Sequence, residues 1–457
     1  MLGNQKCSAE LFQCVTMESL VPEGHMLRRL KAVLDFSFVR PWVADRYSDV
    51  GRPSVDPEVA VRIWVLQHLY GLSERQVCDE MHMHGGFRWF CGLSFNDDIP
   101  DQSTLVKLRN EKWAGSGLWE KVLGETVRAC EAAGICRPDR LALDGTQIRA
   151  NASMASMAEI PANLVLKEVE PGFVKFAPVP EPCAPRMLDG GRERPPRERG
   201  DPNFRGEKFT NHTHRSATDP EARLYRKSSG QEAHLRFLGH YLCEPKSGVI
   251  YGACATQATG AAEREAGLLL LERLEEAPRE LLMDRGYRDG AFFAQLLRRG
   301  VMPLVPMEDR PPEPEPVWQR ETASFHRAGE RKRKLQSVRA RNRVREYVQT
   351  PCAKRALKLR IRIERLFAEG KTHHGLSRAH RRGTEQLGRQ VNMTAAVQNL
   401  KRLAAHTGRR RAAGVAALKV QASLSAVRWA RNRPGNYRNT THRAEHRPRH
   451  LGGPRSG

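Results

Sequence analysis

Arg140-Leu-Ala-Leu-Asp144 and Glu280-Leu-Leu-Met-Asp284 are two short segments with the same pattern, a run of apolar residues that ends in an aspartate. Short apolar runs of this kind are typical of strands buried in a sheet. Each segment would place a carboxylate at the edge of a strand. We therefore expect a mixed sheet in which Asp144 and Asp284 stand where two strands end.

The neighbouring segments predict the rest of this sheet. Residues 234–242 and 249–255 are extended stretches joined by Glu244-Pro-Lys-Ser-Gly248, whose composition predicts the turn of an antiparallel hairpin. Further along the chain we expect two helices and a third strand, at residues 261–274, 289–298 and 301–305. This succession of strands and helices predicts an α/β fold with a mixed sheet and flanking helices.

The part of the chain before this sheet has a helical pattern. Apolar residues recur three and four positions apart over residues 20–123, which predicts a bundle of amphipathic helices. Ser73 is placed to cap one helix, and Asp101 or Ser103 to cap another. The fold expected is therefore an all-α N-terminal region followed by the α/β sheet.

Basic residues follow the second of these caps. Lys107, Arg109 and Lys112 could contact DNA phosphates or bases if the two capped helices form a helix-turn-helix. A packing or dimerisation bundle with solvated basic residues explains the same pattern equally well. Lys107 and Arg109 are retained as candidate DNA-binding residues.

Changes in composition divide the chain into three parts. Residues 1–137 are expected to form a helical DNA-binding or assembly domain, residues 138–405 the catalytic domain, and residues 406–457 a basic tail. An insertion rich in Pro, Gly, Arg and Glu spans about residues 155–205, and we interpret it as a linker without a packed core. The tail contains one acid, Glu445, and is expected to be disordered after about Arg431.

The C-terminal half of the catalytic domain is basic and helical. Arginines and lysines are dense between residues 331 and 345, where Arg339 and Arg343 are candidate DNA contacts. Two long helical patterns follow, at residues 353–369 and 384–405. We expect these two helices to cover the sheet.

The overall charge indicates a polyanionic partner. The 457 residues contain 76 Lys and Arg against 52 Asp and Glu, which gives a net charge of +24. Nucleic acid is favoured over an anionic membrane surface, because there is no apolar run long enough to span a bilayer and no basic, hydrophobic leader. We expect a cytoplasmic protein without a membrane partner. An alternative is a structural protein that binds RNA through its basic tail.

The cysteines favour neither a disulfide framework nor a zinc ribbon. The ten cysteines are scattered without any CxxC pair, so reduced and mostly buried thiols are expected. Cys78, His82, His84 and Cys91 are residue types that bind zinc, but their spacing matches no common zinc finger.

The paired aspartates suggest metal-dependent phosphoryl transfer. Divalent ions such as Mg²⁺ choose oxygen ligands, and a two-metal site needs carboxylates from several elements. Asp144 and Asp284 would supply two of them, and the third would come from a distant helix. Taken alone, each aspartate is also compatible with a turn or a helix cap.

Together these segments resemble the three catalytic motifs of bacterial insertion-sequence DDE transposases. The motifs are Leu143-Asp144-Gly145-Thr146, Asp284-Arg-Gly-Tyr287, and the segment from Arg360 through Glu364 to Lys371. The family spacing around the glutamate is Tyr, two residues, Arg, three residues, Glu, six residues, Lys. Arg360, Glu364 and Lys371 keep this spacing, whereas Leu357 replaces the tyrosine. The resemblance covers about residues 20–403, without the insertion and the tail.

The resemblance implies a ribonuclease-H-like catalytic fold and a metal-dependent DNA enzyme. Two Mg²⁺ ions are implied as the working metal, with Mn²⁺ as a possible substitute. The implied substrates are the terminal inverted repeats of a mobile element and a double-stranded target DNA. A homodimer or higher assembly on two DNA ends, associated with the bacterial nucleoid, is also implied.

The resemblance assigns roles to individual residues. Asp144, Asp284 and Glu364 would be the catalytic metal ligands, with Glu369 as a less favoured substitute for Glu364. Arg360 and Lys371 would hold the DNA backbone near the cut. Among the supporting residues, Thr146 would steady the first acid and Tyr287 would pack beside the second. A decayed or co-opted copy that binds DNA but no longer cuts it is the main alternative to an active transposase.

Overall fold

A computed structural model describes most of the chain. The described residues are 15–33, 35–161, 164–170, 173–178, 209–226, 232–318 and 325–412. The disorder predicted after Arg431 lies outside these residues. None of the described helices combines the length and the apolar character that crossing a bilayer requires.

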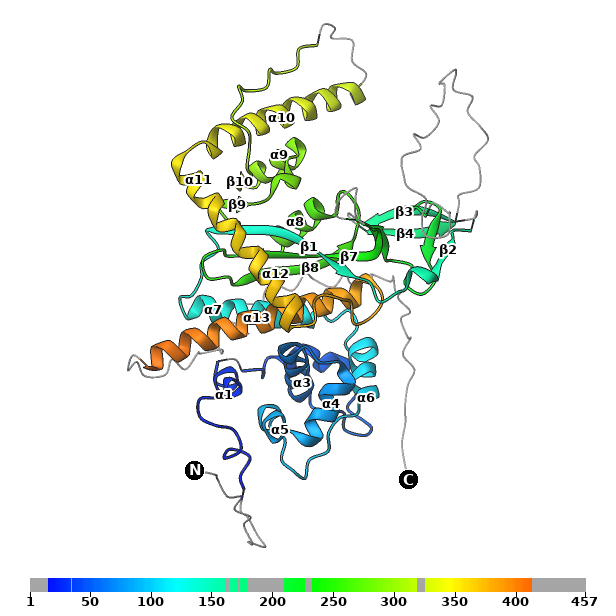
Figure 1. The fold of residues 1–457 in the computed structure, drawn as a ribbon, viewed down its shortest axis with the longest axis vertical. Helices are drawn as coiled ribbons and strands as arrows, with labels where there is room; N and C mark the ends of the chain where they lie inside the picture. The colour runs from blue at the N-terminus through cyan, green and yellow to red at the C-terminus, as the bar shows by residue number, and fades with distance from the viewer. Residues whose placement is uncertain are drawn as a thin grey trace, which may run out of the picture. The chain divides into compact units, whose positions relative to one another are not determined.

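The centre of the fold is a six-stranded mixed sheet (Figure 1). Its order is β10-β9-β1-β7-β6, with β8 also paired to β7. β9 and β10 are parallel to β1 and to each other, whereas β7 is antiparallel to β1, β6 and β8. The strands are β1 (Arg140–Arg149), β6 (Arg223–Tyr225), β7 (His234–Cys243), β8 (Ile250–Gln257), β9 (Glu280–Leu282) and β10 (Met302–Leu304). The predicted hairpin and the predicted mixed sheet are confirmed.

The first strand is longer than the sequence pattern predicted. β1 does not end at Asp144 but continues to Arg149, paired with β7 along its whole later half. Asp144 therefore lies within the strand, opposite Tyr241. Thr146 lies in the strand too, opposite Gly239, and not in a turn; its role in steadying the acid stays a prediction.

Helices cover both faces of the sheet. α8 (Ala262–Glu272) contacts β7 and β8, while α7 (Leu118–Ala132) and α13 (Thr384–Ala412) pack together against β8. Figure 1 shows the sheet between α8 and the α7–α13 pair. α7 belongs in sequence to the helical N-terminal part, so that part and the sheet share one hydrophobic core. The domain boundary at residues 137 and 138 stays a prediction.

The predicted helix over residues 353–369 is divided in two. α11 (Pro351–Leu357) is followed by a single 3₁₀ turn (Lys358–Arg360), and α12 (Ile361–His373) begins after it. α12 crosses the sheet, contacting β1 and α13 (Figure 1). The break gives α12 its own direction and brings its first turn to β1.

The N-terminal part is a set of short helices around α3. The helices are α1 (Met26–Lys31), α2 (Val39–Val43), α3 (Pro57–Tyr70), α4 (Glu74–Met83), α5 (Gly85–Cys91) and α6 (Gln102–Lys107). Trp64 on α3 is buried and meets Trp113 and Trp119 edge to face, with ring centroids 5.4 and 5.1 Å away. Ser73 caps α4 in a capping box with Gln76, and Asp101 caps α6, so both predicted caps are confirmed.

The predicted insertion begins with regular structure. β2 (Met157–Glu159) pairs with β5 (His214–Ser216), and β3 (Leu164–Glu170) forms an antiparallel pair with β4 (Phe173–Pro178). The interpretation of residues 155–205 as a plain linker is therefore wrong for its first part. Residues 179–205 lie outside the described residues.

Polar side chains of α13 fix this helix to the sheet and to α12. The Asn399 amide donates to the carbonyl of Ile250 and accepts from its N–H, at 2.9 and 2.8 Å, which satisfies both backbone groups at the start of β8. Lys401 and Arg402 bind the Glu369 carboxylate at 2.5 and 3.0 Å. Although burial opposes it, the hydrogen bond with His374 and the contacts with Arg402 and Lys401 hold the pKa of Glu369 well below its usual value. Glu369 is thus a structural anchor and not a free substitute for the catalytic acid.

Candidate active site

The pairing of two parallel strands brings the first two acids together. β1 and β9 pair with Ala142 opposite Leu282, and extending this register by two residues aligns Asp144 with Asp284. Asp284 itself follows the end of β9. The two segments with the same pattern therefore become neighbours in space, and the charge of Asp284 acts on Asp144.

Asp144 is a largely buried carboxylate next to other acids. Its side chain is 16% exposed and accepts a hydrogen bond from the Gly145 N–H at 2.8 Å. Burial raises the pKa of Asp144 to about 7, and the charges of Asp284 and Glu263 add to the rise, against the lowering effects of Gly145 and Arg360. Asp284 accepts from the Gly286 N–H at 2.8 Å and caps a 3₁₀ turn.

The raised pKa predicts that Asp144 destabilises the protein at neutral pH. The folded state holds the proton more tightly than the unfolded state, so the stability from this group is complete below about pH 4 and is lost as the pH rises through 7. The shift corresponds to at most about 4 kcal/mol, and we expect ~2 kcal/mol after solvent screening. Asp144→Asn should therefore be more stable than the native chain at pH 8 but not at pH 4.

Urea unfolding with a chelator at both pH values tests this expectation. Asp98→Asn, an exposed acid, is the matched control and should follow the native chain at both pH values. Parallel pH dependences of Asp144→Asn and the native chain would contradict the assignment of a buried, high-pKa carboxylate.

Arg360 links Glu364 to this pair of acids. Its guanidinium lies 3.0 Å from the Glu364 carboxylate and 3.6 Å from that of Asp144. Glu364 is on the first turn of α12 and its side chain is 53% exposed. The contact between Arg360 and Glu364 across one helical turn is the one that the motif spacing predicts.

Glu263 is an acid of this site that sequence reasoning missed. It lies in the first turn of α8, and its Oε1 would stand 3.3 Å from a Cβ built on Gly145. Burial, followed by the charge of Asp284, raises the pKa of Glu263. The carboxylate of Glu263 therefore lies beside β1, next to Asp144 and Asp284.

Two buried polar groups adjoin these acids. The Tyr287 hydroxyl has no hydrogen-bond partner within the described part of the chain, and its pKa is well above normal because it is buried and surrounded by Glu263, Asp144 and Asp284. His240 donates to or accepts from Thr256 at 2.7 Å through Nε2, and its Nδ1 would stand 3.1 Å from a Cβ on Gly145. Glycine at position 145 leaves room for both His240 and Glu263.

The donor set fits a hard divalent cation. Asp144 and Glu263 are poorly solvated and feel the like charge of Asp284, and carboxylate oxygens are the ligands that Mg²⁺ and Mn²⁺ prefer. In the described ranges no three His, Cys, Asp or Glu side chains are gathered closely enough to form a complete metal site. Glu364 joins the other acids through Arg360 and not directly.

The predicted DNA contacts differ in their surroundings. Lys371 is half-buried on α12, and Lys107 is exposed at the end of α6. Arg109 is 7% exposed and forms an ion pair with Glu74, so it cannot act as a surface contact with phosphate. The prediction of an exposed DNA contact at Arg109 is wrong, because its guanidinium is buried.

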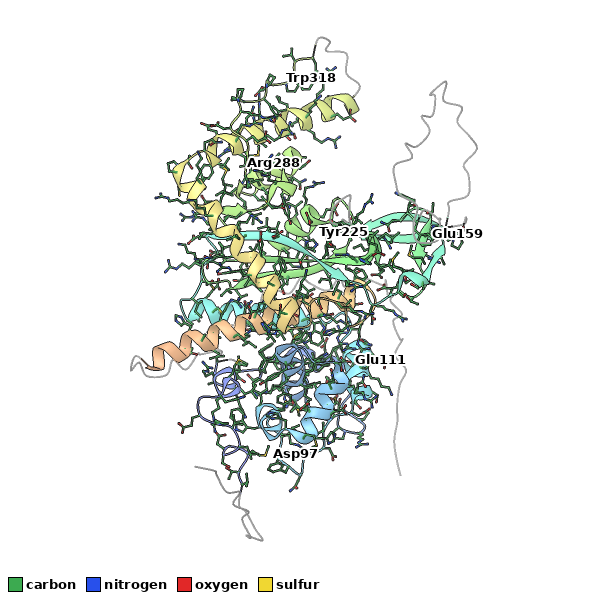
Figure 2. All side chains as sticks on the ribbon, in the orientation of Figure 1. Asp97, Glu111, Glu159, Tyr225, Arg288 and Trp318 are labelled. Carbon is green, nitrogen blue, oxygen red and sulfur yellow. The ribbon has the colours of Figure 1, made fainter. Side chains whose placement is uncertain are left out.

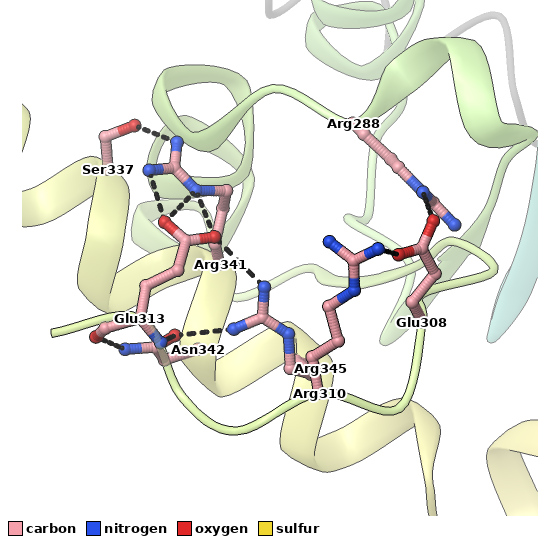
Figure 3. Close-up of polar contacts among 8 residues, drawn as sticks. All are labelled: Arg288, Glu308, Arg310, Glu313, Ser337, Arg341, Asn342 and Arg345. Carbon is pink, nitrogen blue, oxygen red and sulfur yellow. Dashed lines mark hydrogen bonds and ion pairs between the residues drawn. The ribbon is translucent and has the colours of Figure 1, made fainter.

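The basic helix α10 (Phe325–Val348) is partly neutralised by the chain that precedes it. Glu313 binds Arg341 and Arg345 at 2.7 and 3.0 Å (Figure 3), and Glu315 binds Arg339 through two hydrogen bonds of 2.7 and 2.9 Å. Arg339 remains 61% exposed. Arg343 is exposed. DNA would have to compete with Glu315 for Arg339 but would meet Arg343 directly.

The residue after Tyr287 connects the turn of the second acid to the segment that follows β10. Arg288, labelled in Figure 2, donates to the carbonyl of Pro306 at 2.7 Å and lies 3.7 Å from Glu308. These contacts tie the turn that carries Asp284 to the segment leading away from β10. Arg288 is therefore a structural residue of the motif.

Comparisons with known proteins agree with this architecture. A family model described as a transposase domain (DUF772) matches residues 15–111, and one described as a transposase DDE domain matches residues 210–400. The second match contains Asp284 and Glu364 but begins after Asp144. The ribonuclease-H-like fold expected of a DDE domain agrees with the order of the sheet.

One relative among curated proteins is the uncharacterized protein ORF8 in the nfe locus of Rhizobium meliloti. It is 27% identical over 127 residues, which are 27% of this chain and 60% of that protein. The chain thus spans less than two thirds of the length of this relative. No solved structure matches the chain.

Proposed function

The chain belongs to the insertion-sequence DDE transposases, and from this premise we propose that it cuts DNA at the ends of its element and joins the freed 3′-hydroxyl to target DNA. The observation that carries the proposal is the pairing of β1 with β9, which brings Asp144 and Asp284 close enough for their charges to interact. Glu364, linked to Asp144 through Arg360, supplies the third acid. The order and spacing of these motifs support the same assignment.

Asp144, Asp284 and Glu364 would hold the metal, with Glu263 as a further carboxylate. Mg²⁺ is the proposed ion, and Mn²⁺ would replace it in vitro, since both prefer oxygen ligands. When bound, two such ions would activate the attacking oxygen and neutralise charge on the phosphodiester. The Tyr287 hydroxyl would donate to one of the surrounding carboxylates and so fix its orientation.

Cations around the acids would hold the DNA. Lys371 is on the same helix as Glu364, and Arg360 directly precedes this helix. The two cations would therefore bind phosphates on either side of the cut. Lys107 and Arg343 are exposed and would bind backbone phosphates further away. We further propose that two copies assemble on two DNA ends, in the cytoplasm with the chromosome.

The proposal is tested by cleavage of duplex DNA that carries the element's own two ends. Native protein with Mg²⁺ should release 3′-hydroxyl ends and join them to a target plasmid, and a chelator should abolish both reactions. If the protein binds the ends but produces no cut in Mg²⁺ or Mn²⁺, the chain is instead a DNA-binding remnant.

Glu263 gives a prediction of its own within this function. Glu263→Gln keeps the shape of the side chain but removes one negative charge from the acid cluster, so we expect end cleavage to slow by about 10- to 100-fold. The matched control is Glu272→Gln on the same helix, where the native glutamate is 57% exposed and pairs with Arg299. Glu272→Gln should cleave like the native chain, and equal rates for both variants would remove Glu263 from the site.

A further inference from the structure

A cavity of about 480 Å³ lies between the N-terminal helices and the start of α13. It contains none of the candidate active-site acids. Its lining draws on α3, α4, α7, the segment around residue 109 and the segment 380–393. The lining residues used below are Trp64, Glu74, Arg109, Trp119, Arg381 and Arg389.

Positive charge exceeds negative charge around this cavity. Glu74 is the one carboxylate in the lining, and it pairs with both Arg109 and Arg381. Arg389 brings a third guanidinium, 7% exposed, which donates to the Arg109 carbonyl at 2.9 Å and pairs with Glu385, an exposed acid outside the lining. Burial and the repulsion of Arg381 and Arg389 lower the pKa of Arg109 to about 9. An excess of buried positive charge is unfavourable unless an anion compensates it.

Buried N–H donors around the cavity also lack acceptors. Trp64, Trp119 and Arg109 are 1%, 5% and 7% exposed. Trp64 Nε1, Trp119 Nε1 and Arg109 Nη2 have no hydrogen-bond acceptor anywhere in the described ranges. Buried polar groups in native proteins are nearly always paired, so three unpaired donors on one cavity indicate a missing acceptor-rich partner.

We propose that this cavity binds a phosphate group, with Arg109 and Arg389 supplying charge and the indoles of Trp64 and Trp119 supplying neutral donors. Phosphate offers several acceptor oxygens to donors that converge from different elements. The buried Gln67 Oε1 also lacks a donor, which a protonated oxygen of a phosphate monoester would provide. This site stands independently of the proposed cleavage activity, because it uses none of the catalytic acids.

The test is calorimetric titration of the full chain with inorganic phosphate at neutral pH, with chloride replacing phosphate at constant ionic strength as the reference. Native protein should bind one phosphate saturably. Trp119→Phe and Trp64→Phe each remove one N–H and should weaken binding by about tenfold, because a hydrogen bond to a charged group is lost. Arg389→Gln should weaken it at least as much.

Trp113→Phe is the matched control. Its native N–H already donates to Tyr47 at 3.1 Å, and Trp113 does not line the cavity, so phosphate affinity should stay unchanged. Circular dichroism establishes that each variant is folded. The absence of saturable phosphate binding by the native chain would overturn the proposal, as would equal affinities of the three Trp→Phe variants.

A competition experiment with duplex DNA identifies the source of the phosphate. A short duplex without terminal phosphates should leave phosphate binding unchanged if the cavity takes a free or terminal phosphate monoester, which the Gln67 acceptor favours. Displacement by that duplex would instead assign the cavity to phosphates of the DNA backbone.

Discussion

Replacing Asp284 with alanine should lower the rate of DNA-end cleavage by about 10³-fold or more, while DNA binding is retained. The reason is that Asp284 follows β9, near Asp144 on the neighbouring strand β1, and helps to form the proposed metal site. Stabilisation of the reacting phosphodiester by metal ions amounts to several kcal/mol, and each 1.4 kcal/mol changes the rate about tenfold. Glu364→Ala should have an effect of the same order.

The measurement compares cleavage rates at matched occupancy of the DNA. Binding is followed by gel shift in a chelator, and cleavage is started with Mg²⁺. Asp98→Ala, at an exposed acid far along the chain from the motifs, is the control and should cut like the native protein. Cleavage that survives in Asp284→Ala would contradict the assignment, whereas loss of DNA binding would show that the substitution damaged more than the metal site.

The convergence of the first two acids could be predicted because it depends on local patterns. Two apolar runs, each ending in an aspartate, form neighbouring parallel strands. Parallel pairing places their C-terminal ends, and so the two aspartates, at the same edge of the sheet. The length of β1 could not be predicted in this way. Gly145 and Thr146 look like a turn in the sequence, but pairing with β7 keeps them extended.

Glu263 and Arg109 escaped prediction for a related reason. Glu263 has a similar acidic neighbour, Glu265, in the same helical turn, and only the packing of α8 on the sheet distinguishes them. Arg109 follows a capped helix among other basic residues, which favoured a surface role. Its partner Glu74 lies on another helix, and Arg381 comes from the far end of the chain. Such pairings are properties of the tertiary fold.

The ion pairs of Glu74 lead to the largest stability effect that we expect. Its side chain is 4% exposed and is shared by Arg109 and Arg381, so Glu74 joins three distant segments. Glu74→Gln would leave two guanidiniums without their counter-ion. Removing one partner of a buried ion pair costs about 3–5 kcal/mol, and we expect the free energy of unfolding to fall by that amount.

Urea unfolding of the full chain measures this effect, with Glu80→Gln as the control. Glu80 is an exposed glutamate on the same helix, and its substitution should change the unfolding free energy by less than ~0.5 kcal/mol. Equal stability of the two variants would show that the ion pairs of Glu74 contribute little.

Glu74→Gln also tests whether Glu74 has a structural role alone or in addition balances the positive charge of an anion-binding site. Glu74 is the one carboxylate lining the cavity, so its neutralisation increases the positive charge around a bound phosphate. Phosphate should therefore bind more tightly to Glu74→Gln than to the native chain and restore part of the lost stability, because a ligand of the folded state stabilises it in proportion to its affinity. Glu80→Gln should gain no more from phosphate than the native chain does. If phosphate restores none of the unfolding free energy lost in Glu74→Gln, the buried arginines serve only the ion pairs with Glu74 and not an anion site.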